Sequence, residues 1–167
     1  MNAPFASLAR DLQVPAGWRP FTMQGEGFLG HNGPLWLKIE GERLALGMRV
    51  EERHCNPGMI CHGGMMSTFA DMYLALGANY EASLARMLPT ITLNTDFLAP
   101  APLGCWLEGR GEILRRTRRM VFVQGLSTVD GAPVARSSGV FKIGEAADPA
   151  TFDIRARLAG EDHQTLR

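Results

Sequence analysis

A single carboxylate, Asp71, stands in the middle of an apolar stretch, eight residues after the first of two glycines, Gly63 and Gly64. No basic residue lies within one helical turn of Asp71. Burying an unpaired carboxylate costs several kcal/mol or raises its pKa. Perturbed groups of this kind cluster at functional sites. We therefore expect Asp71 to act as a general base or a nucleophile. The alternative is a structural acid that caps another group or pairs with an arginine.

The glycines before Asp71 suit a role as hydrogen-bond donors. Glycine lets a ligand approach the backbone closely, and the first N–H groups of a helix have no acceptor within it. Together with the helix dipole, such groups favour a developing oxyanion. His62, directly before the glycines, is a general base, a substrate contact or a turn residue. Asn56, in a turn with a Pro-Gly pair, either serves that turn or orients water or the reacting carbonyl.

Two other groups of residues could do chemistry. Cys61 precedes His62, but neighbouring side chains of an extended segment point in opposite directions, so we do not expect a Cys–His pair. The run RRTRR, Arg115 to Arg119, is a dense basic cluster in a chain of zero net charge. Guanidinium groups match phosphate oxygens, so this cluster is a candidate phosphate clamp. A solvated hairpin tip is the alternative.

The composition limits the class of protein. The 167 residues are about one domain's worth, with 46% hydrophobic and 20% charged residues, a balance typical of globular proteins. Zero net charge gives no global basic field for nucleic acid or an anionic membrane. The three cysteines lack metal-ligand spacing, which favours free thiols and no metal site. We find no secretory signal and no apolar run long enough to span a membrane, so we expect a cytoplasmic protein.

The hydrophobic pattern predicts one helix among several strands. Residues 64–78 are apolar on every side, which is typical of a helix buried all round, with ends at Gly63-Gly64 and Gly77. Residues 43–50 alternate with a period of two, as in a strand with one buried face. Other expected elements are a helix at 4–14, a hairpin of 28–30 with 35–40, and strands at 91–98, 106–114, 120–129 and 134–143.

Short turns between these strands, such as Asp130-Gly131, indicate an antiparallel sheet. Only that sheet can cover an apolar helix on all sides. We therefore expect an α+β fold in which an antiparallel sheet wraps around a central buried helix. The polar tail from Gly144 should cover an edge of the sheet or fray.

The stretch HCNPGMICHGGMMSTFAD, residues 54–71, closely resembles the signature of the hotdog-fold acyl-CoA thioesterases of the phenylacetate-pathway (PaaI-like) type. The residues in register are His54, Asn56, Gly58, His62, Gly63, Gly64 and Asp71. PTITLNTDFLAPAPLG resembles the family's following strand, and ILRRTRRMVFVQGLSTVDGAPVARSSG its last hairpin. The resemblance covers residues 43–143, which leaves an N-terminal extension, 1–42, and a C-terminal tail, 144–167.

The resemblance implies a hotdog fold, a homodimer or a dimer of dimers, and hydrolysis of an acyl-CoA thioester without a separate cofactor, since CoA is part of the substrate. It makes Asp71 the base or nucleophile, Gly63 the amide that polarises the carbonyl, and Asn56 a holder of the carbonyl or the water. It also places Thr90 near the attacking water. The substrate-binding residues it implies are His62, Gly64, Thr90, Thr92, Phe97, Pro100, Arg115, Arg116 and Arg118.

The spacing of Gly63 and Asp71 indicates that one chain is not enough. Eight residues of helix place them about 12 Å apart, whereas an attacking group must lie about 3 Å from the carbon whose oxygen the amide holds. Two such helices packed antiparallel about a two-fold axis bring each Asp71 beside the other chain's Gly63. Two alternatives stay open: a hotdog enoyl-CoA hydratase, and an acyl-CoA-binding protein without catalysis, which would not need Asp71.

Overall fold

The computed structural model describes residues 12–21, 27–145 and 153–156. Within them, seven strands form one antiparallel sheet in the order β1-β2-β3-β5-β6-β7-β4. The strands are β1 Arg19–Phe21, β2 Leu35–Glu40, β3 Arg43–Arg49, β4 Thr90–Phe97, β5 Trp106–Arg116, β6 Met120–Val129 and β7 Ala132–Lys142. The helices are α2 Phe28–Asn32, the 3₁₀ turn η1 Glu52–His54 and α3 Gly63–Glu81. Residues of the expected N-terminal extension thus supply two strands of the sheet.

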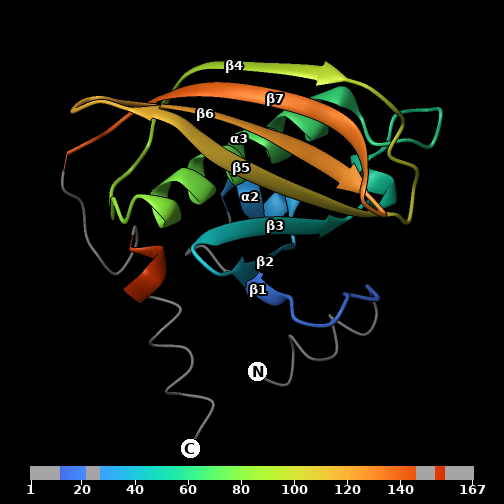
Figure 1. Cartoon of the computed structure of the whole chain (residues 1–167). Coiled ribbons are helices and arrows are strands. Elements are labelled where there is room, and N and C mark those ends of the chain that lie inside the picture. The colour runs from blue at the N-terminus through green and yellow to red at the C-terminus, as the bar shows by residue number, and fades with distance from the viewer. Residues whose placement is uncertain (1–11, 22–26, 146–152, 157–167) are drawn as a thin grey trace, which may run out of the picture.

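The sheet curves around α3 (Figure 1). The helix buries Phe69, Tyr73 and Leu74 completely against it. The strands make room with glycine, because a Cβ on Gly109 would lie 2.2 Å from the Tyr73 ring and one on Gly125 would lie 2.6 Å from it. The expected α+β fold with a sheet wrapped around a helix is confirmed.

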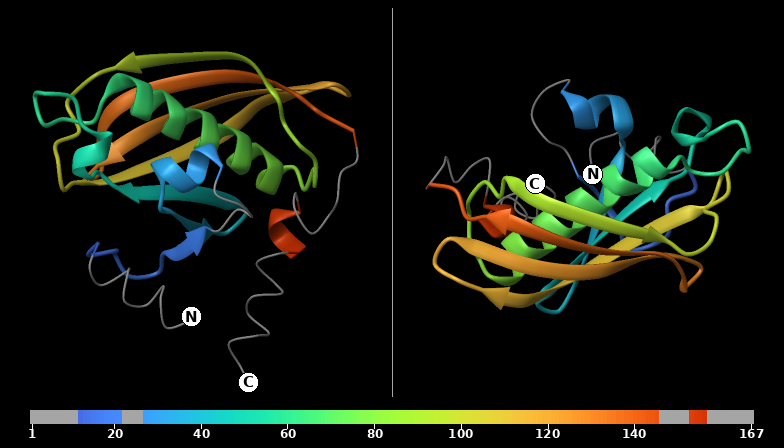
Figure 2. Two further views of the ribbon diagram at one scale, coloured as in Figure 1. Left: turned by 180° about the vertical axis from the view of Figure 1, so that it is seen from behind. Right: turned by 90° about the horizontal axis from the view of Figure 1, so that it is seen from above.

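The helix is not buried all round within one chain, and that prediction was wrong. The view from behind in Figure 2 shows one side of α3 that no strand covers. Partly exposed residues recur on this side at helical spacing, among them Ser67, Asp71 and Ala75. Strand β4 at the neighbouring sheet edge is also open, with Ile91 57% and Phe97 56% exposed. The described chain therefore leaves one helix face and one sheet edge free.

Other boundaries differ from expectation for local reasons. Residues 28–30 are not a strand but part of the short helix α2, in which the Asn32 side chain donates to the Phe28 carbonyl. Helix α3 does not end at Gly77, since this buried glycine lies inside it, and the helix continues to Glu81 before Ser83 turns at φ 47°. The expected helix at 4–14 lies outside the described residues except for 12–14, which are not helical.

Strand β3 is buried on both faces rather than on one. Its inner face packs in the core under α3, and its outer face carries a cluster of Trp18, Trp36 and Trp106. A Cβ on Gly47 would lie 2.5 Å from the Trp106 ring and 2.8 Å from the Trp18 ring, so glycine is what lets these rings pack there. Arg49 lies over Trp106 and donates to the carbonyls of residues 12 and 13. Residues from both before and after the strand therefore cover the face that the alternating pattern predicts to be exposed.

The predicted turn at Asp130-Gly131 is confirmed. Both residues have positive φ, 49° and 80°, as a two-residue type I′ hairpin requires, and they join β6 to β7. In the described part of the tail, Ile154 is buried against Leu44 and Tyr80 near the end of α3. This part covers the helix end rather than the edge strand.

Candidate functional site

The backbone N–H of Gly63, the first residue of α3, is free as a donor. His62 is the N-cap residue, and its Nδ1 accepts the Gly64 N–H at 2.9 Å. The His62 carbonyl accepts the Met66 N–H at 3.0 Å, the first bond of the helix ladder. Among the hydrogen bonds of the described residues, none is donated by the Gly63 N–H. Gly63 is therefore the first helix amide that a ligand can reach as a donor.

The Phe97 ring lies directly against Gly63. A Cβ on Gly63 would lie 3.3 Å from the Phe97 Cζ and within 3.8 Å of two more ring atoms. Phe97 is the last residue of β4, so the end of the edge strand meets the start of the helix (Figure 2). The structure thus brings together two residues that the sequence predicted for the site, and any side chain at position 63 would press on this ring.

The loop before α3 holds Asn56 in a defined orientation. Its Oδ1 accepts the Gly58 N–H at 2.9 Å, and its backbone N–H donates to the Ile60 carbonyl at 2.9 Å. The turn role expected for Asn56 is therefore real. Because the side-chain oxygen is engaged, the Nδ2 amino group is the part of Asn56 that can donate to a carbonyl or a water.

His54 is a structural member of the motif. It is 3% exposed, and its Nδ1 accepts the Glu51 N–H at 3.0 Å, which caps the 3₁₀ turn. Burial lowers the pKa of this imidazole. A neutral, buried His54 therefore stabilises the loop that leads to α3. Its backbone carbonyl accepts the His62 N–H at 2.8 Å.

Asp71 differs from the expectation of a buried, unpaired carboxylate. It is half-buried on the open face of α3, and its Oδ1 accepts a hydrogen bond of 2.7 Å from the Thr90 Oγ1. The carboxylate thus has a hydroxyl partner. Thr90 is not basic and lies 19 residues away in the chain, so the residues next to Asp71 in the sequence do not indicate it. Thr90, predicted to lie near the attacking water, is in direct contact with Asp71.

Thr92 and Pro100 do not join these residues. An irregularity in the register at Ile91 pairs Thr90 with Phe141 but Thr92 with Val140, so Thr92 is turned to the outer face of the sheet. Asp96 shares that outer face and pairs with an arginine of β7 at 2.8 Å. Pro100 is exposed in the loop after β4.

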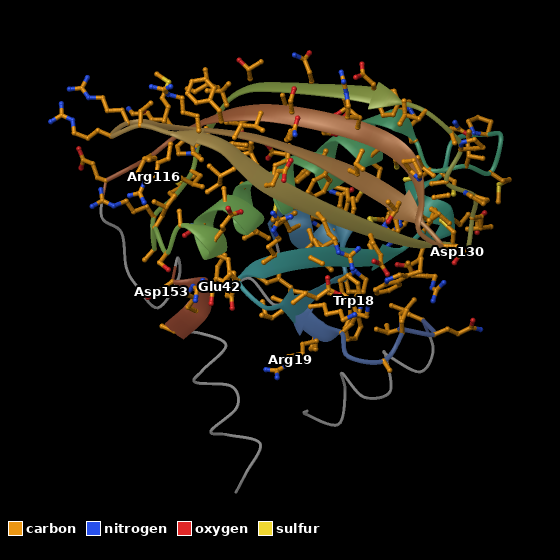
Figure 3. The ribbon with its side chains drawn as sticks, in the orientation of Figure 1. Trp18, Arg19, Glu42, Arg116, Asp130 and Asp153 are labelled. Carbon is orange, nitrogen blue, oxygen red and sulfur yellow. The ribbon has the colours of Figure 1, made fainter. Side chains whose placement is uncertain are left out.

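The arginines of the β5–β6 hairpin are exposed, and the register separates two of them. A bulge at Leu114 pairs Arg115 with Phe122 and Arg116 with Val121, whose side chain is fully buried on the helix side. Arg116 is therefore directed to the helix side of the sheet and Arg115 to the outer side. Figure 3 shows Arg116 at the end of the sheet away from the Asp130 turn.

Arg116 shares a cross-strand row with Thr90. Val121 pairs with Phe141, and Phe141 pairs with Thr90, so three strand spacings separate the two residues. At 4.7–4.9 Å for each spacing, the backbones of Thr90 and Arg116 lie about 14 Å apart. Arg118 lies in the turn of the hairpin, beyond this row.

The thiols near the loop are not poised for nucleophilic chemistry. Burial raises the pKa of Cys61 to about 12 and that of Cys105 to about 11, and it also raises the pKa of Cys55. Thiols of this kind stay protonated at neutral pH.

Within the described ranges, no three His, Cys, Asp or Glu side chains come together as a metal site. No described helix is both long and apolar enough to cross a membrane.

The family comparison matches these features. Residues 58–126 match the model of the thioesterase superfamily. The chain is 31% identical over 133 residues to "Putative esterase PA0474" of Pseudomonas aeruginosa, a match that covers 79% of this chain and 98% of that protein. The chain therefore belongs to the thioesterase superfamily, and its fold is the hotdog fold of that family.

Solved structures share the fold at low identity. Zebrafish thioesterase superfamily member 2 is 20% identical with a TM-score of 0.64, over 83% of this chain and 94% of that chain. The Streptococcus mutans protein smu.793, bound to acetyl CoA, is 18% identical with a TM-score of 0.57, and the match covers 64% of this chain and 85% of that chain. A variant of PaaI from Thermus thermophilus is 17% identical with a TM-score of 0.57, and the match covers 83% of this chain and 99% of that chain.

Proposed function

We propose that this protein is a cytoplasmic acyl-CoA thioesterase of the PaaI-like type, which hydrolyses a thioester to a carboxylic acid and CoA. The observation that carries the proposal is the carboxylate of Asp71, held by Thr90 on the open face of the central helix. Membership of the thioesterase superfamily supports the reaction class. The acetyl CoA bound to a structural neighbour supports a CoA ester as substrate.

The site is completed by a second copy of the chain. Gly63 and Asp71 lie about 12 Å apart along α3, too far to act on one thioester. The open helix face and the open edge of β4 lie side by side (Figure 2), so both can pack against the same surfaces of a second chain. Antiparallel pairing of two β4 edges sets the Phe97 end of one copy against the Thr90 end of the other. That arrangement places each Asp71 beside Gly63 of the partner subunit.

The chemistry follows from these positions. The thioester carbonyl oxygen accepts a hydrogen bond from the free Gly63 N–H of one subunit, and the helix dipole adds to its stabilisation. The Asn56 amino group donates to the carbonyl or to the water. Asp71 of the other subunit draws a proton from water as the water attacks, or attacks directly to form an anhydride that water opens. Thr90 occupies Oδ1 of the carboxylate and leaves Oδ2 for this step.

The arginine hairpin is the candidate phosphate site for CoA. Arg116 faces the helix side in the same row as Thr90, about 14 Å from it, so it can meet the nucleotide end of a substrate whose thioester lies at Asp71. The proposed reaction requires neither a metal nor a redox cofactor, because the carboxylate activates the nucleophile and the amide polarises the carbonyl.

The test is release of free thiol from a panel of acyl-CoA esters, with Asp71→Asn as the variant. We expect release by the wild type and a loss of at least about a hundredfold in kcat for Asp71→Asn, as for the removal of a general base. Asp96→Asn is the matched control, since Asp96 lies on the outer face of β4. Tight binding without release would support the acyl-CoA-binding alternative, and a hydroxyacyl-CoA product from an enoyl-CoA would support a hydratase.

A further inference from the structure

We infer that His62 is a positioning residue for the proposed reaction: its side chain takes up the Gly64 N–H and so leaves the Gly63 N–H as the one glycine amide free for the substrate carbonyl. The inference rests on the proposed function and adds the way in which the donor is selected. Both glycine amides lie in the first turn, where neither has an acceptor within the helix. The His62 Nδ1 at 2.9 Å satisfies one of them.

The imidazole is held in place for this task. The His62 N–H donates to the His54 carbonyl at 2.8 Å, and the His62 carbonyl accepts from Met66 at 3.0 Å, so the backbone is fixed on both sides of the ring. The residue is extended, with φ −62° and ψ 138°, as expected for an N-cap. A Cβ on Gly64 would lie 3.1 Å from Nδ1, so glycine at this position lets the ring come close.

The same hydrogen bond argues against a general-base role for His62. An Nδ1 that accepts the Gly64 N–H carries no proton, so the neutral ring carries its proton on Nε2. Nε2 is then a donor, and neither nitrogen has a free lone pair for a substrate proton. This leaves Asp71 as the proton acceptor at the proposed site and His62 as the residue that arranges the donors.

Capping one amide and leaving the next free has a chemical consequence. If the Gly64 N–H were unsatisfied, it would bind water or compete for the carbonyl oxygen, and the substrate would sample two geometries. With Gly64 capped, the Gly63 N–H is the one glycine amide that remains free, and the Phe97 ring lies beside the same residue. Fixed donors cost no reorganisation during the reaction, which is the basis of oxyanion stabilisation by an enzyme.

The test combines amide hydrogen exchange with kinetics in the full-length protein. In the wild type, NMR should show the Gly64 amide exchanging more slowly than the Gly63 amide. In His62→Ala the Gly64 exchange should rise about fivefold, the ratio that corresponds to loss of an N-cap. The kcat for an acyl-CoA should fall about tenfold with little change in KM, because the donor acts mainly in the transition state.

His62→Asn is the rescue variant, because asparagine is a good N-cap without an imidazole. It should restore both the Gly64 protection and most of kcat. If His62→Ala does not fold, His62→Gln, whose longer side chain caps poorly, takes its place. The inference would be overturned if the Gly64 amide exchanged at the wild-type rate in His62→Ala or His62→Gln. It would also be overturned by a restored cap in His62→Asn with kcat still low, which would show that the imidazole acts chemically.

The two proposals fail in different ways. A wild-type protein that releases no CoA from any ester of the panel would remove the thioesterase proposal, and with it the catalytic meaning of the cap. The exchange rates of the two glycine amides would still show whether His62 selects between them. Normal hydrolysis with equal exchange of Gly63 and Gly64 would remove only the role assigned to His62.

Discussion

Thr90 donates a hydrogen bond of 2.7 Å to the Asp71 carboxylate, although 19 residues separate the two in the chain. The helix supplies the acid, and the edge strand that returns beside the helix supplies the hydroxyl. This contact lies within one chain, so Asp71 is oriented before any partner or substrate binds. It follows that the strand can be altered to test the acid without touching the helix.

Replacing Thr90 with valine should slow the reaction. Thr90→Val keeps the branched shape but removes the donor, and a hydrogen bond to a charged group contributes about 1.5 kcal/mol, which corresponds to about tenfold in kcat. Thr90→Ser, which keeps the hydroxyl, should retain most of the activity. Steady-state rates of CoA release for the three proteins measure this. Equal rates for Thr90→Val and the wild type would mean that the hydroxyl does not orient the carboxylate.

The proposed dimer predicts a residue at the two-fold axis. If Asp71 of each subunit meets Gly63 of the other, the residue midway between them on the helix, Ser67, lies opposite its own copy. Ser67→Cys should therefore form a covalent dimer under mild oxidation, visible on a non-reducing gel.

Ser138→Cys is the control for this cross-link, since Ser138 is exposed on β7 away from the helix face, and the wild type reports the background from its three free cysteines. A Ser67→Cys protein that stays monomeric on the gel while remaining active would contradict the shared site.

The register of the hairpin predicts that its arginines are not equivalent. Arg116→Ala should raise KM for acyl-CoA esters about fivefold, because an exposed ion pair contributes about 1 kcal/mol of binding free energy. The KM for a short thioester that lacks the nucleotide should change little. Arg115→Ala, on the outer face, is the matched control and should leave both KM values near wild type. An equal effect of Arg116→Ala on both substrates would support the alternative, in which the arginines are only a solvated hairpin tip.

The buried His54 predicts a pH dependence of stability. Burial lowers its pKa in the folded protein, so below about pH 6.5 the unfolded chain binds a proton that the folded protein does not. The free energy of unfolding should therefore be highest above that pH and fall as the pH drops below it. Thermal unfolding between about pH 7.5 and 5.5 measures the slope.

His54→Asn keeps an acceptor for the Glu51 N–H but cannot be protonated, so its Tm should depend less on pH over this range. His31→Asn, at an exposed position of α2, should keep the wild-type slope. An unchanged slope in His54→Asn would assign the pH dependence to other groups.

Much of the fold was predictable from the local pattern. Residues 120–129 were expected as a strand and are one, and the strand expected at 91–98 is observed at 90–97, because alternation and turn residues report directly on strands. The end of α3 was misplaced at Gly77, since a glycine that packs inside a helix looks in sequence like one that ends it. The second buried face of β3 was missed because the tryptophans that cover it come from other parts of the chain.

The sequence by itself determined the helix that carries both Gly63 and Asp71, and with it the distance from which the proposal of a second chain was argued, because helical rise depends only on residue count. Only the tertiary structure decided which hydroxyl holds Asp71, which arginine faces the helix and which amide His62 takes up. The first two depend on irregularities at Ile91 and Leu114 that shift each strand by one residue and turn its side chains to the other face. The third depends on the His62 backbone, which hydrogen bonds to His54 and Met66 hold where Nδ1 can accept the Gly64 N–H, and neither kind of contact has a signature in residue type or spacing.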